Sequence, residues 1–233
     1  MQTRDYTSFT SAAKPRFRHV AAQLGYEQVS GIVYLKQIDG WYQLFFLQAA
    51  RHGNDFFYVN YGILVPDLCP VAAPMPLGDC GMLLSDRLRD ADETGGFGRE
   101  TKADIEASAA RVLIQYRKYA LPWHARLNSW DAIAAEYLRV NPIEEALLGK
   151  HTSAFGEDFR AATYGYLLLK ANRKADALRW LREAERLLSL PVYDTRDGQV
   201  VHALEKFARL RKPTDSEVRD LHQVRETIAL IEA

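Results

Sequence analysis

Apolar and polar side chains alternate along three consecutive segments in the first third of the chain, and this pattern predicts β-strands. The expected strands are Glu27–Gln37, Trp41–Ala50 and Asp55–Val65. Asp39-Gly40 separates the first two strands and Arg51–Asn54 the next two, so both links are short enough for hairpins. Short links join antiparallel neighbours, and we therefore expect a β-meander.

Apolar residues at helical spacing predict helices both before and after this meander. Before it, Ser8–Leu24 has an apolar stripe that predicts a helix. Pro15 falls inside this pattern, so a start at Ala13 or Lys14 is the alternative. From about residue 101 the pattern stays helical to the end of the chain. The expected helices are Thr101–Tyr119, a short one from Pro122, Trp130–Val140, Ile143–Leu148, Phe155–Ala171, Lys174–Leu190, Val200–Leu210 and Ser216–Ile231.

The connection between the strands and the helices is rich in turn residues. Pro66–Gly81 holds four prolines and is expected to be a loop, and Asp90–Gly98 an excursion rich in Gly and Asp. Cys80–Leu88 is expected to form either a short fourth strand or a turn. The fold class that follows is α+β, a small antiparallel β-meander packed against helices and followed by an α-helical C-terminal bundle. We expect an α+β domain over residues 1–140 and a helical extension over residues 141–233 that packs on it.

Composition and charge disfavour some classes of partner and location. Thirty basic residues balance thirty acidic ones, which disfavours a nucleic-acid footprint or an anionic membrane surface as partner. No apolar run reaches the roughly 20 residues of a membrane span, and Met1–Pro15 has no apolar signal region. We therefore expect a cytoplasmic protein. Cys69 and Cys80 flank a proline-rich loop. They either form a disulfide or are free thiols, which is the commoner state in a reducing compartment.

Motifs with a catalytic or metal-binding signature are missing from the sequence. The six histidines show neither HExxH spacing nor a nearby Cys partner, and no serine lies in a GxSxG elbow. We therefore expect no metal, no cofactor and no recognisable catalytic residue. Phe155–Leu190 resembles one tetratricopeptide unit, with small and large apolar residues at matching positions, but no second copy follows. A generic helical hairpin is the alternative.

The two faces of the meander differ in chemistry. Side chains alternate between faces along each strand, although the register between strands stays open. We assign one face to the core, with Val33, Leu35, Trp41, Phe45, Leu47, Phe57, Val59 and Ile63. The other face then holds aromatic, amide and lysine side chains, namely Tyr34, Lys36, Tyr42, Phe46, Gln48, Phe56, Tyr58 and Asn60.

This second face has two interpretations. The C-terminal helices cover it, or it is an exposed recognition surface on which rings supply area and amides supply directed hydrogen bonds. Asn60 is informative because Asn is depleted in strands, so its amide needs buried partners or a bound one. Gly62 indicates a close backbone approach nearby. The candidate binding residues are Tyr42, Gln48, Arg51, His52, Asn54, Tyr58 and Asn60.

Several short strings bring in a family resemblance. Leu24-Gly25-Tyr26, Leu47–Arg51, Phe56–Ile63 and Tyr119–Trp123 followed by Ser129 together resemble the domain of unknown function 4304 family, over roughly residues 10–140. This chain departs from the family pattern at Tyr26, where phenylalanine is usual, and in its helical tail. The resemblance implies no catalytic residues, because the family has no established activity. It implies a bacterial accessory or immunity-type protein encoded near secreted toxins.

The function that we expect is a non-enzymatic cytoplasmic module that binds a protein partner, with an immunity-like role as one form. The alternative is an enzyme with dispersed residues, in a pocket between the sheet and the Trp123–Trp130 helices. Arg51, His52 or His124 would then be its acid/base groups. A third interpretation uses the repeat-like hairpin as a docking groove.

Overall fold

The computed structural model describes residues 6–50, 56–77, 81–88, 96–98, 102–142, 157–189, 192–194, 209–211 and 213–233. The chain forms two compact units. The first contains Met1–Pro66 and Met75–Arg126, and the second contains Asp67–Pro74 and Leu127–Ala233. An antiparallel sheet with helices confirms the predicted α+β class. The predicted division into domains at residue 140 stays a prediction.

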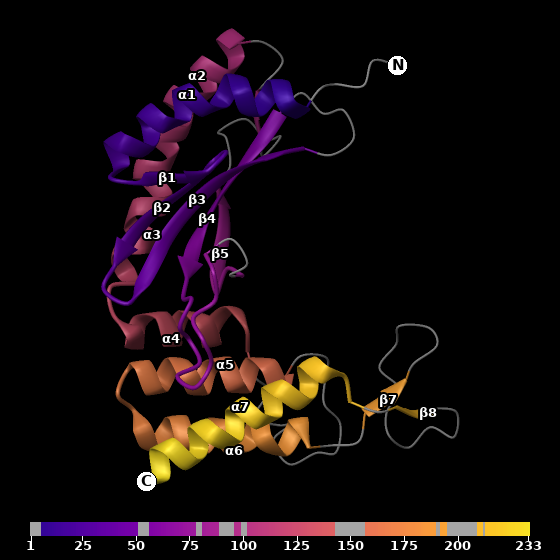
Figure 1. Cartoon of the computed structure of the whole chain (residues 1–233). Coiled ribbons are helices and arrows are strands. Elements are labelled where there is room, and N and C mark those ends of the chain that lie inside the picture. The colour runs from indigo at the N-terminus through magenta and orange to yellow at the C-terminus, as the bar shows by residue number, and fades with distance from the viewer. Residues whose placement is uncertain are drawn as a thin grey trace. The chain divides into compact units, whose positions relative to one another are not determined.

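The first unit is built on one antiparallel sheet. Its strands run in the order β1 (Glu27–Ser30), β2 (Val33–Ile38), β3 (Trp41–Ala49), β4 (Phe56–Leu64) and β5 (Leu84–Leu88) (Figure 1). The strand β6 (Phe97–Gly98) pairs with the start of β4. The predicted meander is therefore confirmed, and the segment Cys80–Leu88 contributes β5 as the further strand. Of the predicted excursion Asp90–Gly98, only residues 96–98 are described.

The predicted first strand is two strands. A turn at Gly31, whose φ is 44°, separates β1 from β2, and the register between them shifts next to Ser30. Glycine adopts this left-handed conformation without the steric cost that a Cβ adds. The chain therefore reverses at Gly31, and β1 pairs back onto β2 instead of extending it.

The two-residue link Asp39-Gly40 fixes the register of β2 on β3. Ile38 pairs with Trp41, which places Tyr34 opposite Phe45 and Val33 opposite Phe46. Our assignment of faces was therefore wrong for β2. Tyr34 and Lys36 share the core face with Phe45, whereas Val33 and Leu35 share the other face with Phe46. The assignments made for β3 and β4 agree with the pairing.

The core face is an aromatic layer. Phe9 and Phe17 of the helix α1 (Tyr6–Leu24) pack on Phe57, with ring centroids 5.3 and 5.5 Å away. Pro15 lies inside α1, so the alternative start at Ala13 or Lys14 is wrong. An interior proline costs about 3 kcal/mol. Burial of Phe9 and Ala13, which precede Pro15 on the packed side, offsets that cost.

Three consecutive helical segments complete this face. They are α2 (Lys102–Gln115), the π-helical turn η1 (Tyr116–Ala120) and α3 (Leu121–Arg126), and in Figure 1 α2 and α3 run along one face of the sheet. Tyr116 packs on Phe45 with centroids 5.4 Å apart, and Trp123 packs on Tyr61 at 5.3 Å. The helices α1 and α3 and the turn η1 therefore contact the same side of the sheet.

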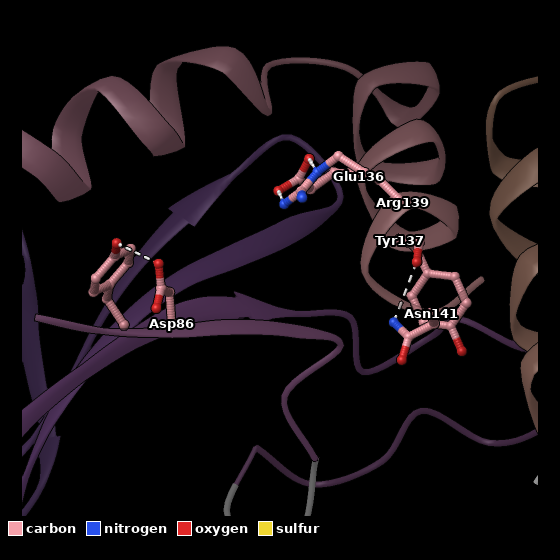
Figure 2. Close-up of polar contacts among 6 residues, drawn as sticks. Asp86, Glu136, Tyr137, Arg139 and Asn141 are labelled. Atoms are coloured by element: carbon pink, nitrogen blue, oxygen red, sulfur yellow. Dashed lines mark hydrogen bonds and ion pairs between the residues drawn. The ribbon is translucent and has the colours of Figure 1, made fainter.

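The second unit is helical. It contains α4 (Trp130–Val140), α5 (Glu157–Lys170), α6 (Lys174–Leu188) and α7 (Asp215–Glu232). Ser129 is the N-cap of α4, and its Oγ accepts a hydrogen bond from the amide of Ala132 at 3.2 Å. At the other end of α4, the Asn141 side chain donates to the Tyr137 carbonyl (Figure 2). A capping box of Thr214 and Glu217 starts α7.

The predicted helical hairpin is confirmed as α5 and α6. Asn172, with φ of 60°, makes the turn between them. A Cβ at Gly165 would lie 2.8 Å from Leu181 Cγ, so the two helices approach too closely for any larger residue. The loop Asp67–Pro74 belongs to this unit, where the Asp67 carboxylate binds Lys170 at 2.8 Å.

Two short strands correct the last part of the prediction. β7 (Val192–Asp194) pairs with β8 (Arg209–Arg211), so the described end of the predicted helix Val200–Leu210 is a strand. The rest of that segment and all of Ile143–Leu148 lie outside the described residues. None of the helices in the described ranges is both long and apolar enough for a membrane crossing.

Candidate binding face of the sheet

The face opposite the helices of the first unit, here called the outer face, carries the alternate residues of β2 to β5. Its composition changes along the strands. At one end Leu35, Leu44 and Leu64 form a buried apolar cluster, against which Val33, Tyr42, Phe46 and Leu77 pack. At the other end lie aromatic, amide and guanidinium groups, contributed by Gln48, Phe56, Tyr58, Asn60 and Arg87.

The polar end is a connected set of side chains. Asn60 Nδ2 donates to Gln48 Oε1 at 3.1 Å, and Arg87 Nε donates to Asn60 Oδ1 at 3.0 Å. Arg87 Nη2 reaches Gln48 Oε1 at 3.4 Å. The Arg87 guanidinium also lies over the Tyr58 ring, 4.2 Å from its centroid. Cation–π contact and amide hydrogen bonds therefore fix the plane of this arginine.

Strand pairing explains why these residues meet. Asn60 pairs with Arg87 across β4 and β5, and Gln48 pairs with Tyr58 across β3 and β4. Side chains opposite or diagonal to each other on one face are close enough to interact. Asn60 is 7% exposed, whereas Gln48 and Arg87 reach solvent. The partners that we expected for the Asn60 amide are thus side chains of the neighbouring strands.

The predicted binding residues do not all gather here. Gln48, Tyr58 and Asn60 lie together, but Tyr42 lies at the apolar end, half-buried against Leu35, Leu44 and Leu64. Arg51, His52 and Asn54 lie outside the described residues, so their placement stays a prediction. Of the two possible thiols, Cys69 is a half-buried free cysteine and Cys80 lies outside the described residues.

Sequence analysis missed Arg87. It follows Asn60 by 27 positions, across a proline-rich connection of irregular length, so no spacing rule links the two residues. One signal was present: Leu84 and Leu88 bracket three polar residues, which indicates a short strand whose ends are buried. Registering that strand on β4 would have placed Arg87 beside Asn60.

The alternative site, an enzyme pocket near His124, is a closed aromatic core. His124 is 3% exposed and is packed by Tyr61, Tyr116 and Trp123, with ring centroids 5.0 to 6.2 Å away. An imidazole this deeply buried does not reach a dissolved substrate without rearrangement of those rings. Trp123 therefore packs in the interior, as a structural residue.

Hydrogen bonds join His124 to the sheet. Tyr26 Oη donates to Gln43 Oε1 at 3.2 Å, and the hydroxyls of Tyr26 and Tyr116 share a bond of 2.8 Å. Tyr116 Oη lies 3.1 Å from His124 Nε2. Because each hydroxyl has one proton, this order of donors leaves His124 Nε2 to donate to Tyr116. His124 Nδ1 is then a buried acceptor, and it has no hydrogen-bond partner among the described residues.

Burial controls the acidity of this network. It lowers the pKa of His124 from 6.5 to about 3, with a smaller contribution from the positive charge of Lys36. It raises the pKa of Tyr26 to about 12, against an opposing hydrogen bond from Tyr116. The imidazole is therefore neutral at physiological pH, with a pKa far below the value near 7 that suits a general base.

A shallow groove of about 490 Å³ lies between α1 and α2. Its titratable side chains are Arg16, His19 and Glu106, and all three reach solvent. His19 Nε2 is 2.8 Å from Gln23 Nε2 on the same helix. The groove therefore contains no buried titratable side chain. No group of residues within the described ranges could hold a metal ion.

Comparison with protein families, curated proteins and solved structures adds no relative. No family model, no curated protein and no solved structure matches this chain. The resemblance to the domain of unknown function 4304 family therefore stays a prediction based on the short strings described above.

Proposed function

We propose that this protein is a non-enzymatic binding module that holds a protein partner on the outer face of its sheet. The observation that carries the proposal is the connected set Gln48, Asn60, Tyr58 and Arg87. A planar cation, two amides and a ring are held in fixed positions next to the half-buried rings of Phe46 and Phe56.

The fixed position of Arg87 lowers the entropic cost of binding a partner. Immobilising a flexible side chain on binding costs about 0.5–1.5 kcal/mol. The contacts of Arg87 with Asn60, Gln48 and Tyr58 restrict its side chain before any partner arrives. Arg and Tyr are also among the residues that dominate binding energy in protein interfaces. An arginine fixed in this way on an exposed surface is therefore better explained by binding of a partner than by a contribution to the stability of the fold.

The enzyme alternative has less support. His124 is the candidate acid/base group that lies within the described residues, and it is enclosed by rings. Its lowered pKa has desolvation as the main cause, which is the usual result of burying a structural histidine. We therefore propose no reaction for this network.

A crosslinking experiment tests the proposed face. A photo-crosslinking amino acid replaces Ser85, which is exposed on β5 and shares the outer face with Arg87. The same amino acid at Ala135, exposed on α4, is the matched control. We expect the Ser85 position to give an adduct with a protein that the Ala135 position does not give.

The captured protein is then purified and its Kd is measured by calorimetry. Tyr58→Ala should weaken binding at least tenfold, while Ala135→Ser leaves the Kd unchanged. If Ser85 gives no adduct of its own, or if Tyr58→Ala binds as tightly as wild type, the outer face is not the binding surface and the proposal fails.

A further inference from the structure

Arg87 differs from Arg139, Arg186 and Arg225 in the nature of its partners. Arg139 binds Glu136 at 2.7 Å (Figure 2), Arg186 binds Glu183 at 2.6 Å, and Arg225 binds Glu185 at 2.9 Å. Each of these guanidinium groups has a carboxylate. The guanidinium of Arg87 has only the neutral oxygens of Asn60 and Gln48 and the Tyr58 ring among the described residues.

The carboxylate of the neighbouring residue, Asp86, does not bind the Arg87 guanidinium. Asp86 points to the core side of the sheet, where its Oδ2 accepts a hydrogen bond from Tyr61 Oη at 3.2 Å (Figure 2). Its Oδ1 accepts from the backbone amide of Arg87 at 2.7 Å. The alternation of side chains along β5 therefore separates the carboxylate of Asp86 from the guanidinium of Arg87.

Among the described residues, most of the N–H donors of Arg87 have no acceptor. A guanidinium has five N–H donors in a fixed plane. Nε and Nη2 donate to the two amides, and Nη1 has no acceptor among the described residues. The side chain is exposed, so these donors face solvent. A carboxylate is the acceptor whose two oxygens match such a planar pair of donors.

Arg87 is the only charged residue on the outer face among the described positions of β2 to β5; Glu27 of β1, opposite Leu35, lies on the same side at the far margin of the sheet. The other described positions of the outer face on β2 to β5 are apolar, aromatic, amide or serine residues, since Lys36 lies on the core side. A nucleic acid or a highly phosphorylated segment needs several cations in a row. A lone oriented guanidinium matches one monovalent anion, with half-buried rings beside it for an apolar neighbour.

We infer that the partner is a protein segment that presents an Asp or Glu carboxylate to Arg87, with an apolar or aromatic side chain beside it on Phe56 and Tyr58. This inference depends on the proposed function, because it names what the outer face recognises. The carboxylate would complete the contacts of Arg87 as glutamate does for the other arginines. Asn60 and Gln48 would act as positioning residues that hold the guanidinium plane.

Selection from a random dodecapeptide library displayed on phage tests the inference with the full chain immobilised. The chains compared are wild type, Arg87→Gln, Arg87→Lys, Tyr58→Ala and a control, Arg173→Gln. Arg173 is an exposed arginine of the second unit that binds Asp176. We expect the peptides that lose at least tenfold in affinity on Arg87→Gln to be enriched in Asp or Glu. Replacement of that acid by its amide should cost wild type a similar factor and Arg87→Gln little.

The outcomes separate the two proposals. Peptides that depend on Arg87 but carry no acidic residue would overturn the carboxylate and leave the outer face as a binding surface. Peptides insensitive to both Arg87→Gln and Tyr58→Ala would overturn the proposed function itself. The inference would also be overturned if an oligothymidylate bound more tightly than the acidic peptides and Arg87→Gln abolished that binding. Arg87→Lys keeps the charge without the planar fork, so we expect intermediate affinity at an unchanged Tm.

Discussion

Tyr34 and Phe45 lie directly opposite each other on β2 and β3, and their rings stack with centroids 4.7 Å apart on the buried side of the sheet. The Tyr34 side chain is fully buried, and its hydroxyl has no hydrogen-bond partner among the described residues. Burial also raises the pKa of Tyr34 to about 12. The ring thus stabilises the core by packing, while the buried hydroxyl without a described partner lowers the free energy of unfolding.

Tyr34→Phe should therefore leave stability unchanged or raise it by up to about 1 kcal/mol, because an unpaired buried hydroxyl is removed and the ring remains. Tyr116→Phe is the control, since its hydroxyl bonds to both Tyr26 and His124, and it should lose about 1–3 kcal/mol. Urea unfolding measures both changes. A loss at Tyr34→Phe as large as at Tyr116→Phe would show that the Tyr34 hydroxyl has a partner.

His124 makes stability depend on pH in the acid range. Its pKa is about 3 in the folded protein and near 6.5 when unfolded. Between these values the unfolded chain binds a proton that the folded chain does not. Stability therefore falls as pH decreases below 6.5, by at most about 1.4 kcal/mol per pH unit, and by about 2 kcal/mol between pH 7.5 and 5.

Denaturant unfolding at pH 7.5 and 5 checks this dependence. His124→Gln, which does not titrate, should lose most of the difference between the two pH values. His222→Gln is the control, because His222 is exposed on α7 and should leave the difference intact. An unchanged difference in His124→Gln would assign the acid sensitivity to other groups.

Gly62 sets how closely β4 and β5 can approach. A Cβ at this position would collide with the backbone carbonyl oxygen of Leu84, which a rotamer change does not relieve. Gly62→Ala should cost about 1–3 kcal/mol, as overpacking does in closely packed cores. Gly81→Ala is the control, since no atom of the described residues apart from its chain neighbours lies within 4 Å of its added Cβ. It should change stability by less than about 0.5 kcal/mol. Thermal unfolding distinguishes the two variants.

Tyr42 and Tyr58 share the outer face but should respond differently to truncation. Tyr42→Ala removes a ring that packs on Leu35, Leu44 and Leu64, so we expect about 1–3 kcal/mol less stability and a nearly unchanged Kd for the partner. Tyr58→Ala should lower partner affinity at least tenfold with a smaller loss of stability. Calorimetry measures the Kd and urea unfolding measures the stability of both variants. If Tyr58→Ala loses as much stability as Tyr42→Ala and keeps its affinity, both rings are structural and the prediction is wrong.

The meander and its central residues were predictable because local rules decide them. Two-residue and short polar links imply antiparallel neighbours, and the depletion of Asn in strands pointed to Asn60. The faces of β2 were also within reach: pairing Ile38 with Trp41 across Asp39-Gly40 requires Tyr34 to face Phe45. We assigned Val33 and Leu35 to the core on hydrophobicity alone, and register overrides hydrophobicity in a paired strand.

Other features depend on contacts distant in sequence. Arg87 joins Asn60 only after a loop whose length specifies no register, and Pro15 is tolerated in α1 only because residues on both sides of it pack on the sheet. The strand β8 replaced part of a predicted helix because it pairs with β7, which has no alternating pattern long enough to detect.

The pairing of β4 has a consequence for the order in which the backbone exchanges its hydrogens with solvent. β4 is held by β3 along one edge and by both β5 and β6 along the other, whereas β1 is a four-residue strand at the margin. In deuterated water the amides of β4 should be the last of the sheet to exchange, and those of β1 the first. Asn60 lies on that slowest strand, so the amide that positions Arg87 is anchored in the most persistent part of the sheet.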